Sequence, residues 1–315
     1  MSKKVFLTGA TGLIGKETLP FLLENDFEIY ALTKRDLNSI DNVNYIKGNL
    51  FDKAFIQGVM SEIKPEYLLH FAWYCTGVFE DNINYEFLSS SLDLLKAFGE
   101  NGGKKAVMAG TYAEYGYYNE NLKESFVAQP INAYSKCKDF LHQISASYCE
   151  NNDISFGWGR IFSAFGLESD PRRLTSYVIN NLLENKEIVI KSGSLIRDYI
   201  YSKDVARAFV SFLDSDVDGV LNICSGKDTS IHDYVMMIAG ILDKKHLVKF
   251  EEQKSNQQTR VVGDTEKLRN ELKFSSKYNI YDALLEVIEQ SKFRAGGGGV
   301  EPSLNYFVVH IRWAA

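Results

Sequence analysis

The stretch Val5-Phe6-Leu7-Thr8-Gly9-Ala10-Thr11-Gly12-Leu13-Ile14-Gly15 decides the fold of this chain. A short apolar run predicts a buried strand, three glycines spaced three apart follow, and a helical pattern then begins. Gly9 would allow a tight turn, Gly12 would let the backbone approach phosphates, and Gly15 would let the helix lie close to the strand. Because a helix N-terminus favours negative charge, the stretch predicts a site for a dinucleotide pyrophosphate. Three glycines alone would indicate only a turn.

Length and charge exclude several classes of partner. The chain has 315 residues and a formal net charge of −6, which argues against nucleic acid or an anionic membrane as a partner. No apolar run is long enough to span a membrane, and a chain that begins directly with a strand predicts no signal peptide. Four scattered cysteines without a Cys-x-x-Cys pair are typical of reduced thiols, not of metal ligation (Cys75, Cys137, Cys149 and Cys224). We expect a cytoplasmic protein without a metal.

Strands and helices are predicted to alternate along the first half of the chain. Apolar runs predict strands at 28–32, 43–46, 67–72, 105–108 and 154–158, and amphipathic patterns predict helices at 55–63, 88–98 and 133–149. Alternation of this kind is typical of an α/β fold with a doubly wound parallel sheet. Its ligands bind at the carboxyl ends of the strands.

The ends of the second and third strands supply cofactor candidates. Thr33, Lys34 and Arg35 follow the second strand, where a carboxylate would bind the ribose 2′-hydroxyl of NAD and a cation would accommodate the 2′-phosphate of NADP. The two cations favour NADP(H) over NAD(H), and the alternative is an ordinary solvated basic turn. Asn49 and Leu50, after the third strand, are candidates to frame the adenine.

The fourth strand is expected to end at Phe71-Ala72, where a small side chain would leave room for the cofactor. His70 precedes them. It is better explained as a core or strand-end histidine with satisfied hydrogen bonds than as a catalyst.

The later chain changes character. Helices are expected at 174–183, 202–214, 231–242 and 281–291, with short strands at 187–191 and 220–223. This mixture predicts a smaller domain over the mouth of the sheet, with some segments returning to the large domain. Residues after about Arg294 join no upstream pattern, since a flexible tetraglycine at 296–299 precedes an isolated apolar run. We expect 295–315 to be an added or read-through segment, whose deletion leaves activity and melting temperature unchanged.

Tyr134 and Lys138 are the candidate catalytic pair. They lie four residues apart at the start of a predicted helix and therefore share one face. A lysine ammonium beside a tyrosine phenol would lower the pKa of Tyr134 and make it usable for proton transfer near neutral pH. The pattern Tyr-x-x-x-Lys also occurs at 30/34, at a strand end, and at 199/203, in an expected extended loop. Only the pair at 134/138 follows a strand that ends in a hydroxyl residue, Thr111. The alternative is an ordinary surface pair.

These motifs together resemble the extended short-chain dehydrogenase/reductase superfamily, in its NAD(P)-dependent epimerase/dehydratase branch that acts on nucleotide sugars. The resemblance runs from Val5 to about Gln290 and rests most on TGATGLIG at 8–15 and YSKCK at 134–138. The stretches GTYAEYG at 110–116 and RDYIYSKDV at 197–205 add to it. It implies a Rossmann-type nucleotide-binding domain over 1–165 and a smaller C-terminal α/β substrate domain over 166–294.

By this resemblance Thr111 hydrogen-bonds the reacting oxygen, Tyr134 transfers the proton, and Lys138 binds the nicotinamide ribose and tunes Tyr134. Other cofactor-binding candidates are Gly9, Thr11, Gly12, Leu13, Ile14, Gly15, Phe71, Ala72 and Ile161, and other substrate-binding candidates are Trp73 and Ser163.

Four arginines are candidates to bind a substrate diphosphate. Arg197 occupies the position that grips the diphosphate in the family, and its alternative is a structural pair with Asp198 or Asp204. Arg260 and the pair Arg172-Arg173 are further candidates, with plain surface charge as the alternative.

Departures from the family pattern narrow the expected chemistry. The related sugar 4,6-dehydratases carry Asp-Glu directly after the threonine, whereas Tyr112 and Ala113 stand here. Glu114 follows one residue later and should point elsewhere if this segment stays extended. The usual Asn of an Arg-x-x-Asn pattern is Ser163, which leaves the sugar contacts open. A dehydratase is therefore disfavoured.

We expect an enzyme, and specifically an NADP(H)-dependent reductase of a nucleotide-linked 4-keto-6-deoxysugar. Hydride would reach C4, and Tyr134 would protonate the forming alkoxide. The alternatives are an NAD-dependent 4-epimerase and, from another class, a non-catalytic nucleotide-sensing protein on the same fold. The resemblance also implies a homodimer through the helices at 88–98 and 133–149.

Overall fold

The computed structural model describes residues 3–39, 42–75, 79–168, 170–251 and 258–295. The predicted tail lies outside this range from residue 296 onward. Within the described residues, no helix is both long enough and apolar enough to cross a membrane.

A seven-stranded sheet whose neighbouring strands are all parallel forms the centre of the described structure. Its strands follow the order β11-β6-β5-β4-β1-β2-β3. Their bounds are β1 Lys3–Thr8, β2 Phe27–Thr33, β3 Val43–Lys47, β4 Tyr67–His70, β5 Lys105–Thr111, β6 Ser155–Ile161 and β11 Gly219–Ile223. The chain reverses its direction of travel across the sheet between β1 and β4. The doubly wound sheet predicted from the sequence is confirmed.

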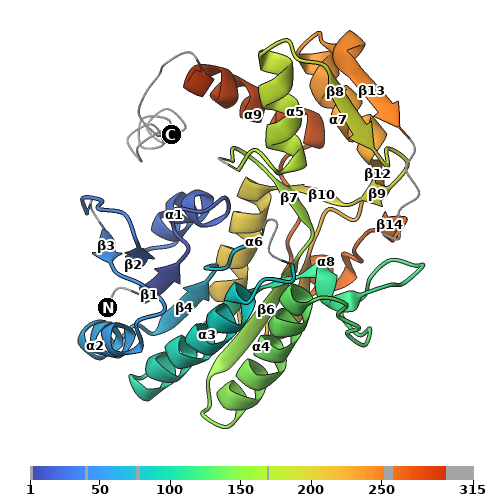
Figure 1. Ribbon diagram of the computed structural model, residues 1–315. Helices are drawn as coiled ribbons and strands as arrows, with labels where there is room; N and C mark the ends of the chain where they lie inside the picture. The colour runs from blue at the N-terminus through green and yellow to red at the C-terminus, as the bar shows by residue number, and fades with distance from the viewer. Residues whose placement is uncertain (1–2, 40–41, 76–78, 169, 252–257, 296–315) are drawn as a thin grey trace.

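Helices cover both faces of this sheet (Figure 1). On one face α1 (Gly15–Glu24) and α6 (Ser202–Leu213) pack against the strands together with α8 (Glu266–Asn270). On the other face lie α2 (Lys53–Ile63), α3 (Ile83–Glu100) and α4 (Ala133–Glu150). Coverage on both sides explains why the central strands are continuously apolar, with Val5, Phe6 and Leu7 all fully buried.

A separate apolar cluster forms the upper part of the molecule in Figure 1. It is built from α5 (Leu174–Leu183), β8 (Ile188–Lys191), α7 (Ile231–Ile241), β13 (Val248–Glu251) and α9 (Ile280–Ala295). Tyr234 is its centre. This residue is fully buried, stacks on Tyr199 with ring centroids 3.8 Å apart, and shares a 2.8 Å hydrogen bond with Thr175.

Short strands lie between the large sheet and this upper cluster. β7 (Ser163–Phe165) pairs with β10 (Tyr199–Tyr201), and β9 (Ile196–Arg197) lies between β12 (Thr229–Ser230) and β14 (Arg260–Val261). The expected extended loop at 199–203 is therefore wrong, because strand β10 leads directly into α6. Helix α6 packs on the large sheet and β11 is one of its strands, although both follow the first segments of the upper cluster in the sequence.

β4 is shorter than predicted. It ends at His70, so Phe71 and Ala72 lie in the segment that follows it. The reason is a contact with the neighbouring strand: the amide of Ala72 donates to the Thr8 side-chain hydroxyl at 3.2 Å and so leaves the backbone ladder.

Candidate active site

The glycine turn after β1 has the geometry that the sequence predicts for a phosphate-binding turn. Gly9 adopts φ +72°, and a Cβ on it would lie 2.9 Å from the amide nitrogen of Ala72. A Cβ on Gly15 would lie only 2.1 Å from the carbonyl oxygen of Gly9, so the helix could not approach the turn with any other residue. Thr11 and Gly12 are exposed. The turn therefore lies at the carboxyl edge of the sheet, between the ends of β1 and β4.

The start of α1 has no side-chain cap. Its N-cap residue, Ile14, makes no side-chain capping bond, so no side chain of the cap competes for the first N–H groups. Leu13 and Ile14 are half-buried. Exposed Gly12 beside this helix start fits the pyrophosphate of a dinucleotide.

The end of β2 is basic, as the sequence suggests. Thr33 is buried, and its hydroxyl accepts the amide of Arg35 at 3.0 Å. The Lys34 ammonium lies 5.3 Å from the centroid of the Phe51 ring. The nearest acid in sequence, Asp36, is exposed and pairs with Lys47 at 2.7 Å. No carboxylate therefore stands at residues 33–35, where one would bind a ribose 2′-hydroxyl.

Tyr134 is presented by a well-defined helix start. Asn132 caps α4, with its side chain accepting the amide of Ser135 at 2.9 Å, and the Ser135 hydroxyl completes a capping box. The amide of Tyr134 donates to the carbonyl of Phe79 at 2.9 Å, and the two rings meet edge to face at 5.9 Å. Tyr134 is thus fixed in the first turn of α4.

Thr111, Tyr134 and Lys138 come together as predicted, each buried to more than nine-tenths. The Thr111 side chain is near enough to the Tyr134 phenol to lower its pKa. Lys138 donates at 2.8 Å to the carbonyl of Ala109, which lies in β5 two residues before Thr111. β5 and α4 therefore supply the site together, since Thr111 ends β5 and the other two residues share one face of α4.

The expected lowering of the Tyr134 pKa is wrong in this structure. Burial raises the pKa of Tyr134 well above its usual range, Cys75 raises it further, and the neighbouring Thr111 side chain lowers it. The Lys138 ammonium instead lies 4.0 Å from the centroid of the Trp73 ring, and burial lowers the pKa of Lys138 to about 8. Desolvation of Tyr134 therefore outweighs the lowering of its pKa that the nearby lysine predicts.

Glu114 does not behave as expected, because residues 112–115 form a 3-10 helix and not an extended segment. Its carboxylate is fully buried and pairs with Arg160 at 2.8 Å. It also accepts the indole N–H of Trp158 at 3.0 Å and the amide of Thr111 at 2.7 Å. The carboxylate is therefore held within the protein core behind Thr111.

His70 is a core histidine with satisfied hydrogen bonds, as interpreted from the sequence. Its ring nitrogens bond the hydroxyls of Thr8 at 2.6 Å and Ser91 at 2.8 Å. Complete burial lowers the pKa of His70 to about 3, so the ring is neutral.

The remaining cofactor candidates lie near the ends of β3, β4 and β6. Asn49 is exposed and accepts the amide of Phe51, whereas Leu50 is only 7% exposed and packs into the core. Leu50 is thus mainly a core residue. Phe71, Ala72 and Ile161 are half-buried.

The candidate diphosphate arginines differ in their partners. Arg172 pairs with Asp170 at 2.8 Å, Arg173 with Glu168 at 2.9 Å, and Arg260 with Asp228 at 2.7 Å. Arg197 donates to the backbone carbonyls of Ile196 and Gln258.

Asp198 and Asp204, the alternative partners predicted for Arg197, bind other groups. Asp198 accepts three backbone amides, those of Ser225, Gly226 and Gly263. Asp204 pairs with Arg207.

The sequence gives little sign of several neighbours of the site. The Cys75 thiol is 3.9 Å from the Tyr134 hydroxyl, a contact that the spacing of the cysteines does not predict. Trp73 was a substrate candidate, but its ring stacks on Phe87 and its indole N–H donates to Asn84. Ser163, in β7, is half-buried. The contact between Cys75 and Tyr134 follows no sequence pattern, because it joins residues 59 positions apart.

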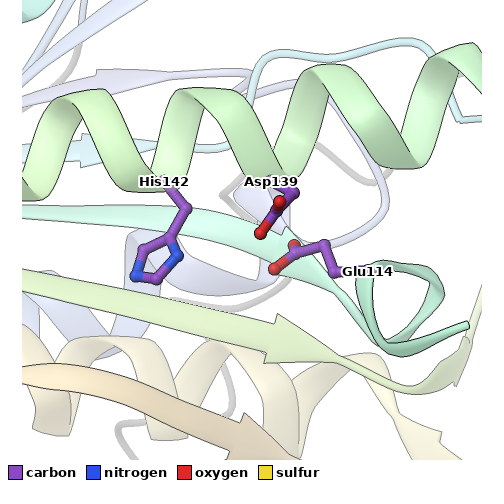
Figure 2. A group of neighbouring side chains, drawn as sticks. All are labelled: Glu114, Asp139 and His142. Carbon is purple, nitrogen blue, oxygen red and sulfur yellow. The ribbon is translucent and has the colours of Figure 1, made fainter. Parts of the chain in front are cut away.

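Behind Thr111, Figure 2 shows the carboxylate of Glu114 near two side chains of α4, Asp139 and His142. Their potential ligand atoms all lie within 4.8 Å of one another. Glu114 is already paired with the Arg160 guanidinium, whose positive charge would repel a metal cation.

Comparison with known proteins agrees with this geometry. The dTDP-6-deoxy-L-talose 4-dehydrogenase (NAD(+)) of Aggregatibacter actinomycetemcomitans is 23% identical over 240 residues, 73% of this chain and 87% of that protein. The UDP-glucose 4-epimerase of Pisum sativum is 25% identical over 325 residues, 89% of this chain and 93% of the relative. The crystal structure of UDP-glucose 4-epimerase from Thermotoga maritima with UDP-glucose superposes with a TM-score of 0.84 at 19% identity, covering 93% of this chain and 99% of that one.

The last comparison shows a shared fold. The family match is more direct, because it spans residues 5–224, from the first strand of the large sheet to the residue after its last strand. It confirms the predicted resemblance and the expectation of an enzyme that uses a nicotinamide dinucleotide. The chain belongs to the NAD dependent epimerase/dehydratase family.

Proposed function

We propose that this protein is an NADP(H)-dependent reductase of a nucleotide-linked 4-keto-6-deoxysugar. The observation that carries the proposal is the triad of Thr111, Tyr134 and Lys138 beside a segment without the dehydratase acids. Positions 112 and 113 are Tyr and Ala, and the nearby Glu114 is engaged in the core by Arg160. The site therefore holds a proton donor without an acid–base pair for eliminating water.

The chemistry of the triad suits reduction. A bound reduced nicotinamide supplies the hydride that reaches the C4 carbonyl. Tyr134 donates its phenolic proton to the forming alkoxide, and the Thr111 hydroxyl orients that oxygen by a hydrogen bond. Because burial raises the pKa of Tyr134, the phenol is protonated at neutral pH, which is the state that a reductase needs. Lys138, one turn further along α4, would bind the ribose of the nicotinamide.

The preference for NADP(H) rests on the end of β2. Lys34 and Arg35 follow the strand, Lys47 lies on the neighbouring β3, and Asp36 is already paired with Lys47. A 2′-phosphate would gain cations here, whereas a bare ribose 2′-hydroxyl would find no carboxylate at residues 33–35. The dehydrogenase relative carries NAD(+) in its name, so the proposed preference would distinguish this chain from that relative.

A 4-epimerase that uses NAD is the second candidate. Similarity to the Pisum sativum UDP-glucose 4-epimerase favours it, because the match extends over 89% of this chain. Such an enzyme first oxidises C4, so Tyr134 would have to act as a base. Tightly held dinucleotide in the purified protein would distinguish this reaction from a reductase.

Arg197 is the arginine that we propose for the substrate diphosphate. It is half-buried in β9, donates to the backbone carbonyls of Ile196 and Gln258, and occupies the position that grips the diphosphate in the family.

The first experiment is to denature the purified protein and identify any released nucleotide by mass spectrometry. The apoprotein is then titrated with NADPH and NADH and assayed with 4-keto-6-deoxysugar nucleotides and with UDP-sugars. An empty site that prefers NADPH and reduces a keto-sugar is the expected result. Stoichiometric bound NAD with UDP-sugar epimerisation would replace the reductase by the epimerase. Dinucleotide binding without any turnover would favour the non-catalytic alternative.

A variant tests the cofactor preference separately. Replacing both Lys34 and Arg35 by Ala should raise the Kd for NADPH by about 10- to 100-fold, because two charge-assisted contacts to a phosphate are lost. The Kd for NADH should change by less than about threefold. Lys53→Ala is the matched control, since Lys53 pairs with Asp93 on the surface. Equal losses for both dinucleotides would contradict an NADP(H) site.

A further inference from the structure

A buried carboxylate lies directly behind the catalytic threonine. One oxygen of Glu114, Oε1, accepts the amide of Thr111 at 2.7 Å. The other, Oε2, accepts the guanidinium Nε of Arg160 at 2.8 Å and the indole N–H of Trp158 at 3.0 Å. The side chain is fully buried and cannot touch a substrate.

These bonds fix Thr111 from two sides. Its amide donates to Glu114, and its hydroxyl oxygen accepts the amide of Ala113 at 3.3 Å, which closes a capping box over the 3-10 helix. The same hydroxyl is close enough to the Tyr134 phenol to affect its pKa. The backbone is shaped to admit the carboxylate, because a Cβ on Gly110 would lie 2.8 Å from Glu114 Oε1 and 2.2 Å from the Trp158 indole nitrogen.

The buried ion pair of Glu114 and Arg160 adds little stability, because burying its charges requires desolvation. Removing both charges from water costs several kcal/mol, and well-packed apolar residues often stabilise a protein as well or better. Here the Arg160 guanidinium also lies 4.3 Å from the Tyr115 ring centroid, and its buried Nη1 finds no hydrogen-bond partner among the described residues. An arrangement that leaves a donor unsatisfied is poorly optimised for stability alone.

We propose that Glu114 is a positioning residue for the reaction: it holds the Thr111 amide so that the Thr111 hydroxyl stays aligned with Tyr134. Arg160 and Trp158 in turn hold the carboxylate by joining the ends of β5 and β6. The inference rests on the proposed function only in needing a reaction at Tyr134, which the reductase and the epimerase share.

The test is a double-mutant cycle between Glu114→Gln and Thr111→Ala. The amide of Gln keeps the size of the side chain but cannot accept from Thr111, Arg160 and Trp158 together. In the wild-type background Glu114→Gln should lower kcat about 10- to 100-fold and change KM by less than about threefold. In the Thr111→Ala background the same substitution should change kcat by less than about twofold, since the hydroxyl that it positions is gone. Equal losses in both backgrounds would overturn the proposal.

Asp204→Asn is the matched control. Asp204 is a buried carboxylate that likewise accepts one arginine, Arg207, and backbone amides, those of Lys277 and Tyr278. It should lose stability with kcat within about twofold of wild type. A fall in kcat as large as that of Glu114→Gln would mean that loss of any buried carboxylate impairs turnover, and the proposal would fail.

A readout without turnover separates this inference from the proposed reaction. Threonine methyl NMR, with the Thr111 signal assigned by its loss in Thr111→Ala, should show one side-chain rotamer in the wild type and averaging in Glu114→Gln. An unchanged Thr111 methyl overturns the positioning role whatever the substrate proves to be. If Glu114→Gln does not fold, Trp158→Phe removes one donor to the carboxylate, and the same cycle with Thr111→Ala should show a smaller loss of kcat, about threefold.

Discussion

At the scale of single residues, burial decides the chemistry of the site more than sequence neighbours do. Tyr134 and Lys138 are one helical turn apart, yet the pKa of Tyr134 is raised by burial and that of Lys138 falls to about 8 for the same reason. Taking a charged group out of water disfavours its charged form, whichever sign it carries. Each residue is therefore shifted toward its neutral form.

Tyr134→Phe should abolish proton transfer and leave the cofactor site intact. Only the hydroxyl is removed, so we expect kcat to fall by about 10²- to 10⁴-fold. The Kd of the dinucleotide should stay within about threefold of wild type. Steady-state kinetics and a fluorescence titration measure the two quantities. Unchanged turnover would refute the role assigned to Tyr134.

His70 should make the free energy of unfolding depend on pH. Its pKa is about 3 in the folded protein and near 6.5 when unfolded, so below pH 6.5 only the unfolded state binds the proton. Stability is then lost as the pH falls, by about 2 kcal/mol at pH 5. Urea unfolding at pH 7.5 and 5 should show this loss in the wild type and lack it in His70→Gln. Parallel losses in both proteins would show that the histidine is not neutral in the core.

At the scale of elements, the site depends on how helices and strands begin and end. α1 starts without a side-chain cap beside exposed Gly12, whereas α4 starts with a complete capping box that holds Tyr134. β5 ends in Thr111, which itself caps a short 3-10 helix. The proposed dinucleotide-binding end of α1 has no side-chain cap, and the ends that present the proposed catalytic residues are fixed by capping bonds.

Gly15 and Gly58 offer a matched pair for testing the turn. A Cβ at Gly15 would overlap the carbonyl of Gly9, whereas a Cβ at Gly58, exposed in α2, meets nothing within 4 Å. Gly15→Ala should lower the free energy of unfolding by about 1–3 kcal/mol and weaken dinucleotide binding. Gly58→Ala should raise it by about 0.5–1 kcal/mol, because Ala is the better helix former. Thermal unfolding and a binding titration measure both, and a harmless Gly15→Ala would mean that the helix does not need close contact with the turn.

At the scale of the whole molecule, the large sheet with its two apolar layers is separate from the upper cluster, which suggests that the two parts bind different ligands. We propose that the large sheet binds the dinucleotide and that the upper cluster, within 166–294, forms the substrate domain. Arg197 lies on β9, between the sheet and that cluster (Figure 1). This place would let one arginine reach a substrate held between the two parts.

α3 and α4 lie side by side on one face of the molecule and carry exposed apolar side chains. Tyr85 is 56% exposed, Phe140 54% and Ile144 49%. Phe140 and Ile144 are four residues apart on α4, so they form one stripe. We propose that a second copy of the chain covers this stripe.

The expected particle has twice the chain mass of 35.7 kDa in sedimentation or light scattering. Phe140→Glu with Ile144→Glu should convert it to a monomer, since two charges would be buried unpaired at the interface. Phe293→Glu, at an exposed apolar position on α9, is the control and should stay dimeric. A monomeric wild type would rule out this dimer.

The sequence by itself determined the order of strands and helices, the turn after β1 and the triad of Thr111, Tyr134 and Lys138. These features follow local rules: apolar periodicity sets the elements, glycine allows the turn, and a spacing of four places two side chains on one helix face. The helix predicted at 174–183 matches α5 at both ends for this reason. The end of β4 was missed because the Thr8 hydroxyl, 64 residues away, takes the amide of Ala72.

Only the tertiary structure decided what surrounds the triad. The partners of Glu114 are Trp158 and Arg160, 44 and 46 residues further along the chain, and the ring under Lys138 belongs to Trp73. The carboxylate that pairs with Arg260 likewise belongs to a residue 32 positions away, Asp228. Burial, and with it the direction of each pKa shift, is a property of the packed chain. Burial depends on which distant segments exclude water, and no local sequence pattern predicts that.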